Sequence, residues 1–142
     1  MAIVLTDLGA DAILRIIYNN DWPAGGKDLT LKLYTNNYTP LDTSVAGDFT
    51  EAAGGGYAAV TLTNGSWTIT PGNDPSDAVY AQQVWTFTGP LTGNTTIYGW
   101  FIVDADGVCW KAEKYDFSFT PAKNGDQLRE TPRVQASKGT PS

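Results

Sequence analysis

Apolar and polar residues alternate along two segments of the first half of the chain. The leucines at positions 29, 31 and 33 alternate with Thr30, Lys32 and Tyr34, which is the pattern of a strand with one buried face. A second alternation starts at Val60 and continues past Asn64-Gly65 to Ile69. Because Asn-Gly readily adopts the positive φ angles of a tight turn, this second segment is expected to form a β-hairpin.

The rest of the chain continues in short alternating runs separated by turn-forming residues. The expected strands are Leu29–Thr35, Tyr57–Thr63, Ser66–Thr70, Ala78–Phe87, Thr96–Asp104, Val108–Lys114, Phe117–Thr120 and Asp126–Arg133. Thr96–Val103 is apolar on both faces and predicts a central strand, with a bulge or a close contact at Gly99. The expected fold class is therefore mainly β, an antiparallel β-sandwich or jelly roll with a short N-terminal α-helix.

The N-terminal apolar residues have the spacing of a helix. Leu8, Ile13, Ile16 and Ile17 recur at helical intervals, and Thr6 or Asp7 is placed to cap the helix. Acidic residues interrupt the run, so an amphipathic helix fits better than a signal peptide, and we expect a mature protein made in the cytosol. The domains expected are an N-terminal helix and turn at 1–27, a β-sandwich at 28–133 and a polar tail at 134–142.

Composition narrows the classes of function. The chain has 142 residues, which suits one domain, and only 17% of them are charged. Its formal net charge is −6, and no basic stripe of the kind that neutralises phosphates is visible, so direct nucleic-acid binding is not expected. The chain lacks an apolar run of about 18 residues, so no membrane span is expected.

The residues that usually carry catalysis are scarce. The chain has no histidine and one cysteine, Cys109, which excludes histidine-dependent nucleophile systems and sites with imidazole ligands. Cys109 is expected to be a buried structural thiol. The acidic residues considered as paired carboxylates are Glu51, Glu113, Asp116, Asp104 and Asp106, and the last two with Gly107 resemble half of a calcium cage. Surface and turn positions explain them better, so we expect no enzyme, no catalytic residue, no metal and no cofactor.

Aromatic residues offer a different kind of site. The chain has five tryptophans and seven tyrosines, which would suit a protein interface or a sugar platform if several lay together outside the core. Trp85 and Trp100 belong to alternating strands and are expected in the core. Trp22, Tyr34 and Tyr38 are the best candidates for exposed aromatics.

Two long segments resemble a family of small virion-associated proteins of tailed bacteriophages. They are LKLYTNNYTPLDTSVAGDFTEAAGGGYAAVTLTNGSWTIT (Leu31–Thr70) and YAQQVWTFTGPLTGNTTIYGWFIVDADGVCWKAEK (Tyr80–Lys114), and the turn at Phe119–Asp126 adds a further motif. The resemblance covers about Leu31 to Asp126 and is spread over five short motifs. Cys109 stands where hydrophobic residues are more usual in that family.

The resemblance implies a structural role on the virion, which would be assembled in the host cytoplasm. The function it favours is that of a capsid decoration or cement protein, bound to the major capsid protein of the phage shell and forming a homodimer or homotrimer. The alternatives are a neck, tail or fibre-attachment module of the virion, or a soluble carbohydrate-binding β-sandwich. The expected partner interface is the apolar N-terminal helix with the exposed aromatics, namely Ile3, Leu5, Leu8, Ile13, Ile16, Ile17, Trp22, Tyr34 and Tyr38.

Overall fold

The computed structural model describes residues 3–71 and 76–136. Within them the fold is mainly β, with antiparallel sheets and one helix near the N-terminus, as the sequence predicts. The elements are α1 (Asp7–Asn19), β1 (Val4–Leu5), β2 (Leu29–Tyr34), β3 (Val60–Leu62), β4 (Thr68–Thr70), β5 (Ser76–Val79), β6 (Gln83–Thr86), β7 (Ile97–Val103), β8 (Cys109–Phe119), β9 (Gln127–Glu130) and β10 (Arg133–Ala136), with 3₁₀ turns at Ala46–Asp48 and Thr92–Asn94.

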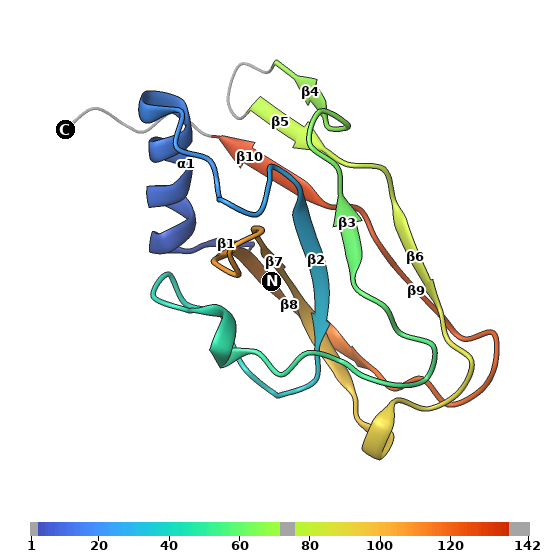
Figure 1. Cartoon of the computed structure of the whole chain (residues 1–142). Coiled ribbons are helices and arrows are strands. Elements are labelled where there is room, and N and C mark those ends of the chain that lie inside the picture. Colours follow the sequence, from blue (N-terminus) through green and yellow to red (C-terminus); the bar gives the residue numbers. More distant parts are fainter. Residues whose placement is uncertain (1–2, 72–75, 137–142) are drawn as a thin grey trace.

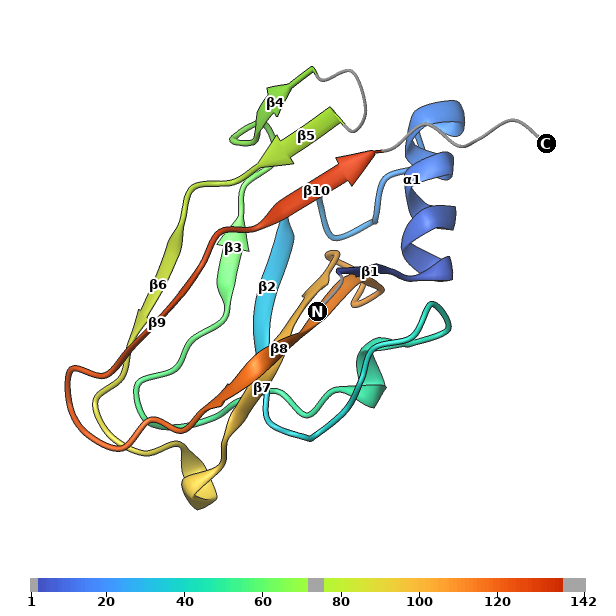
Figure 2. The same cartoon turned by 180° about the vertical axis from the view of Figure 1, so that it is seen from behind.

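The largest sheet has five strands in the order β1-β8-β7-β2-β3. A three-stranded sheet, β10-β5-β4, and a two-stranded sheet, β6-β9, form the rest. Figures 1 and 2 show that β5 continues into β6 beside β9 and β10, so these strands make one long ribbon that faces the larger sheet. The ribbon bends between its two ladders, where the Tyr80 N–H donates to the Pro132 carbonyl at 2.9 Å.

The main hydrophobic core lies between these two layers. It is built from buried residues of both: Leu31, Leu33, Leu62, Ile97, Trp100, Ile102 and Tyr115 from the large sheet, and Trp85, Phe87 and Leu128 from the ribbon and its end. Leu31 and Leu33 are fully buried, as their alternation in the sequence predicts. The arrangement is therefore sandwich-like.

The other face of the large sheet is covered by the loop between β2 and β3. Phe49 of this loop stacks on Phe101 of β7 with ring centroids 4.8 Å apart, in a second cluster that includes Tyr34 and Cys109. Since β7 packs against a core on each side, its apolar sequence on both faces is explained. The expected central strand is confirmed.

Gly99 lies at an irregularity of the large sheet. The register between β7 and β8 shifts between Ile97 and Gly99, and a Cβ at Gly99 would collide with the Glu113 carbonyl and with the Tyr34 ring. The expected bulge and close contact are both present. The shift also turns Tyr98 away from Trp100 and towards the second cluster.

The expected hairpin at Asn64-Gly65 is wrong. The turn exists, with Gly65 at φ 87° and a hydrogen bond of 3.1 Å from the Ser66 N–H to the Thr63 carbonyl. However, β3 before it pairs with β2, while β4 after it pairs with β5. The turn therefore passes the chain from one layer to the other.

Several expected boundaries also change. The expected strand Ala78–Phe87 is split into β5 and β6, and Phe117–Phe119 continues β8 without a break. At the N-terminus, Val4–Leu5 is a strand paired with β8 that the sequence did not predict, and the helix starts at Asp7, directly after the predicted cap position Thr6.

Strand structure does not end at Arg133, because Arg133–Ala136 forms β10 against β5. The residues 137–142 of the expected tail lie outside the described residues. Within the described part of the chain, no helix is long and apolar enough to cross a membrane.

Candidate functional site: the surface around helix α1

Helix α1 starts at a cap that the sequence predicts. Thr6 has an extended backbone, and its Oγ1 accepts a hydrogen bond of 2.9 Å from the Gly9 N–H, which satisfies one of the free N–H groups of the first turn. The helix ends at Asn19, and its cap residue Asn20 has a left-handed backbone. The Asn20 N–H donates to the Ile16 carbonyl at 3.1 Å, and the Asp21 N–H donates to the Arg15 carbonyl at 3.2 Å. The Thr6 side chain at one end and the left-handed backbone of Asn20 at the other thus set the length of the helix.

The helix is tied closely to β8. Thr6 is fully buried, its N–H donates to the Trp110 carbonyl at 3.0 Å, and its hydroxyl donates to the Cys109 carbonyl. Gly9 is buried where α1 crosses β8, and a Cβ there would lie 2.5 Å from the Trp110 carbonyl oxygen. The absence of a side chain at Gly9 lets the two backbones come this close.

The outward side of α1 carries large apolar residues that the core does not use. Leu14 is 56% exposed, Ile17 66% and Tyr18 79%. We call these three residues the outer face of α1. The inward positions Ile13 and Ile16 are partly buried. Figure 1 shows α1 at one edge of the molecule, with the strands on one side of it only.

Two of the hollows beside the helix lie between it and other parts of the chain, and we name them by their walls. The acidic crevice, of about 230 Å³, is lined by Asp11, Arg15, Asp21, Asp104 and Asp106, with Leu8, Ala12, Ile16, Trp22, Pro23 and Val108. The tryptophan groove, of about 200 Å³, is lined by Trp22, Trp67 and Trp110, with Ile13, Ile16, Ile17, Lys27, Leu29 and Asn64. A smaller cavity of about 130 Å³ adjoins the groove, with which it shares four lining residues, and Lys111 lies in its wall.

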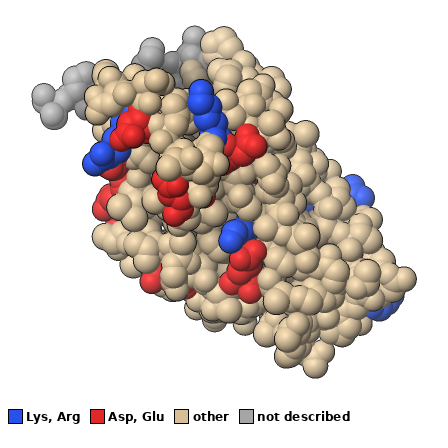
Figure 3. All heavy atoms as spheres, viewed as in Figure 1, with Lys and Arg blue, Asp and Glu red and all other residues tan. Residues whose placement is uncertain are grey.

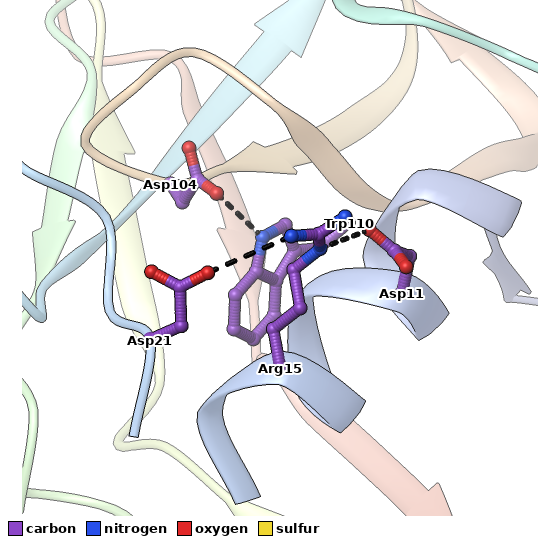
Figure 4. Close-up of polar contacts among 5 residues, drawn as sticks. All are labelled: Asp11, Arg15, Asp21, Asp104 and Trp110. Atoms are coloured by element: carbon purple, nitrogen blue, oxygen red, sulfur yellow. Dashed lines mark hydrogen bonds and ion pairs between the residues drawn. The ribbon is translucent and has the colours of Figure 1, made fainter. Parts of the chain in front are cut away.

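Arg15 is the cation of the acidic crevice (Figure 4). Its Nε lies 2.7 Å from Asp11 Oδ2, and its Nη1 lies 3.6 Å from Asp21. The hydrogen bond and the charge of Asp11 raise the pKa of Arg15 above its usual value. All three side chains are more than half exposed, so these ion pairs add little to stability.

Asp104 and Asp106 form the other wall of the crevice, in the turn between β7 and β8. The indole N–H of Trp110 donates to Asp104 Oδ2 at 2.9 Å (Figure 4), and two backbone N–H groups of the turn donate to Asp104 Oδ1. Asp106 accepts from the Ala24 and Gly25 N–H groups. The two carboxylates thus hold the turn and the segment after α1 in place.

The hydrogen bonds of Asp104 and Asp106 explain why this turn resembles half of a calcium site. The oxygens that would face a cation accept hydrogen bonds from N–H groups of the chain. In the part of the chain that the structure describes, no group of three or more acidic or cysteine side chains could hold a metal ion. Figure 3 shows several acidic side chains at the end of the molecule that carries α1 and others nearer the middle of this face, with Lys and Arg side chains beside some of them.

The tryptophan groove brings together aromatics that the sequence left apart. Of the three aromatics expected to be exposed, only Trp22 lines it. Tyr34 is fully buried, so its place in the expected interface is wrong, and Tyr38 is partly buried against the second cluster. The sequence did not predict that Trp67 and Trp110 belong to this site. Trp67 follows the turn at Asn64-Gly65 and Trp110 follows the turn at Asp104–Gly107, and residues of both turns line the hollows beside α1.

The remaining carboxylates lie elsewhere. Glu51 pairs with Lys32 at 3.0 Å and accepts from the Tyr57 hydroxyl. Burial raises the pKa of Glu113. It also raises the pKa of Glu130 to about 7, although the Tyr115 hydroxyl, which donates to it at 2.9 Å, opposes the rise. None of these residues lines the hollows around α1.

Cys109 is fully buried, as predicted for a structural thiol. Burial raises its pKa to about 12, so the thiol stays protonated near neutral pH. Of the other residues expected at the interface, Ile3, Leu5 and Leu8 are exposed, and Ile13, Ile16 and Ile17 line the tryptophan groove.

Comparison with known proteins gives no match: no family model fits the chain, and no curated protein or solved structure is similar to it.

Proposed function

We propose that the protein is a non-enzymatic structural protein of a tailed-bacteriophage virion, a decoration or cement protein that binds the major capsid protein and stabilises the head shell. Two lines of argument support this proposal. One is the resemblance of Leu31–Thr70 and Tyr80–Lys114 to small virion proteins of such phages. The other is the outer face of α1, an apolar surface that the fold itself leaves uncovered.

The outer face of α1 is the observation that carries the proposal. Exposed apolar side chains scattered singly over a protein need no explanation, but Leu14, Ile17 and Tyr18 lie within two turns of one helix. The helix is held on β8 by Gly9 and Thr6 from its other side. It is therefore a rigid, preformed surface, which a clamp between shell subunits needs.

The test is rebinding of the purified protein to parent particles from which it has been removed. The double variant Leu14→Asp/Tyr18→Asp replaces two side chains of the outer face that are 56% and 79% exposed and that line neither hollow, so it is expected to fold. We expect it to lose most of its binding, measured by co-sedimentation with the particles. The matched control is Val84→Asp, because Val84 on β6 is also exposed, at 45%, and β6 lies on the opposite side of the molecule from α1 (Figure 1).

Full binding of the double variant would contradict the role of α1. Binding of the unaltered protein to the neck or tail, seen by electron microscopy of labelled particles, would replace the shell by that part of the virion. Binding to glycans, with quenching of tryptophan fluorescence and no association with particles, would favour the soluble carbohydrate-binding module.

A further inference from the structure

The tryptophan groove and the acidic crevice meet at one ridge. Ile16 of α1 and Trp22 of the following segment belong to the walls of both hollows. A group bound in one hollow therefore lies beside a group bound in the other. The ridge itself is apolar, so the two hollows form one continuous surface next to the outer face of α1.

The chemistry of the groove favours an apolar occupant. Apart from Lys27 and Asn64, its walls are aliphatic or aromatic. Two of its three indole N–H groups already donate hydrogen bonds within the chain: that of Trp110 to Asp104 and that of Trp22 to Asn20. A sugar would bury hydroxyl groups here with few partners, at a cost in free energy, whereas a large aliphatic or aromatic side chain would need none.

The charge of the acidic crevice determines which kind of group can bind next to the apolar side chain in the groove. Four carboxylates line the crevice, and Arg15 pairs with only two of them, Asp11 and Asp21. Asp104 and Asp106 accept hydrogen bonds from neutral N–H groups, which orient the carboxylates but leave their charge uncompensated. The crevice therefore favours a cation and disfavours an anion.

We propose that this surface binds a segment of a partner protein that places one large apolar side chain in the tryptophan groove and a lysine or arginine in the acidic crevice. The segment belongs to the shell protein if the function proposed above holds, and this identification rests on that function. The apolar side chain supplies the buried area, and the cation sets the orientation of the segment across the ridge.

The test uses the full chain labelled with ¹⁵N and the dipeptide acetyl-leucyl-arginine amide as the probe. The chain has five tryptophans, and each gives one indole N–H signal. Those of Trp22, Trp67 and Trp110 are expected to shift as the dipeptide is added. Those of Trp85 and Trp100, which are 5% and 0% exposed in the core, are expected to stay in place and serve as internal controls.

Two further probes separate the hollows. Acetyl-leucyl-glutamate amide is expected to bind about three- to fivefold more weakly than the arginine peptide, because an exposed ion pair contributes at most ~1 kcal/mol. Acetyl-alanyl-arginine amide is expected to lose most of the shift at Trp67, since alanine fills little of the groove.

Variants assign the effects to residues. Asp21→Asn is expected to reduce the preference for the arginine peptide over the glutamate peptide, and Ile17→Asn is expected to weaken both peptides equally. The matched controls are Asp42→Asn and Val84→Asn, which replace exposed residues that line neither hollow. Both controls are expected to bind like the unaltered protein.

Three results would overturn the proposal. They are indole signals that do not move with any peptide, equal affinity for the arginine and glutamate peptides, and tighter binding of methyl β-glucoside than of the arginine peptide at the same signals. The outcome is independent of the virion. If the peptides bind as expected and the protein is absent from particles, the proposed function fails, and the site remains with a different partner protein.

Discussion

Thr6 connects the start of α1 to the sheet. Its hydroxyl accepts from the Gly9 N–H at 2.9 Å and donates to the Cys109 carbonyl, and the residue is fully buried. A buried hydroxyl with both partners present stabilises the fold, whereas loss of the hydroxyl leaves a buried N–H without a partner. The same side chain thus caps the helix and fixes it to β8.

We expect Thr6→Val to lower the free energy of unfolding by about 2 kcal/mol, because it removes the cap and keeps the side-chain volume. Thr6→Ser retains the hydroxyl and is expected to cost clearly less. Urea denaturation of the three proteins measures both effects. Equal stability of the valine and serine variants would show that the hydroxyl contributes nothing.

Glu130 is a carboxyl group whose burial has a consequence for stability. Burial raises its pKa from 4.5 to about 7, the neighbouring Glu113 adds to the rise, and the hydrogen bond from Tyr115 opposes it. Between these two pH values the folded protein binds more protons at this site than the unfolded chain does. Its stabilising effect is therefore complete below about pH 4.5 and is lost as the pH rises through about 7.

The free energy of unfolding is accordingly expected to fall between about pH 4.5 and pH 7, by about 1–2 kcal/mol from this group, which is less than the full shift implies because the side chain is partly exposed to solvent. Glu130→Gln keeps an oxygen that accepts from Tyr115 and removes the titration, so most of the fall is expected to disappear. Glu51→Gln, at an exposed position, is the control and should retain it. Denaturation at several pH values tests this, and an unchanged slope in Glu130→Gln would contradict it.

At the scale of elements, the contact between α1 and β8 depends on Gly9. Alanine is the better helix former, but a Cβ at Gly9 would lie 2.5 Å from the Trp110 carbonyl oxygen and 2.6 Å from its Cα. Both are backbone atoms, so the helix itself must move. The close packing outweighs the helical preference.

Gly9→Ala is therefore expected to lower the free energy of unfolding by about 1–3 kcal/mol, although alanine gains about 1 kcal/mol in an isolated helix. Gly47→Ala is the matched control, because a Cβ at Gly47 meets no atom within 4 Å. Thermal denaturation compares the two. A stabilised Gly9→Ala protein would show that α1 does not pack as closely as described.

Local signals in the sequence predicted the elements better than their partners. The cap at Thr6, the alternation of Leu31 and Leu33, and the bulge at Gly99 each depend on residues within a few positions, and each is present. The hairpin at Asn64-Gly65 failed because the turn does not determine what its strands pair with. Strand β4 instead pairs with β5, because the packing of the two layers determines which strands meet.

The candidate site was predicted only in part for the same reason. Helical spacing identified Ile13, Ile16 and Ile17, which do line the tryptophan groove. Tyr34 was expected outside the core because it shares a strand face with polar residues. The loop that carries Phe49 covers that face, and no pattern within the strand reports on such a distant segment.

At the scale of the whole molecule, the parts of the surface differ in how well they could bind a partner protein. Both faces of the large sheet are covered by cores of the chain itself. The end that carries α1 differs, because it combines the outer face of α1, the tryptophan groove and the acidic crevice. A protein that binds through one preformed end suits repeated attachment to a shell.

The central claim is that this chain decorates the shell of a phage head. Quantitative mass spectrometry of purified parent particles, expressed per copy of the major capsid protein, tests it most directly. We predict a ratio near one, or about one third to one half, as lattice symmetry allows for a decoration protein. A ratio of a few per cent would place the chain at the neck or tail, and its absence from the particle would contradict the virion role altogether.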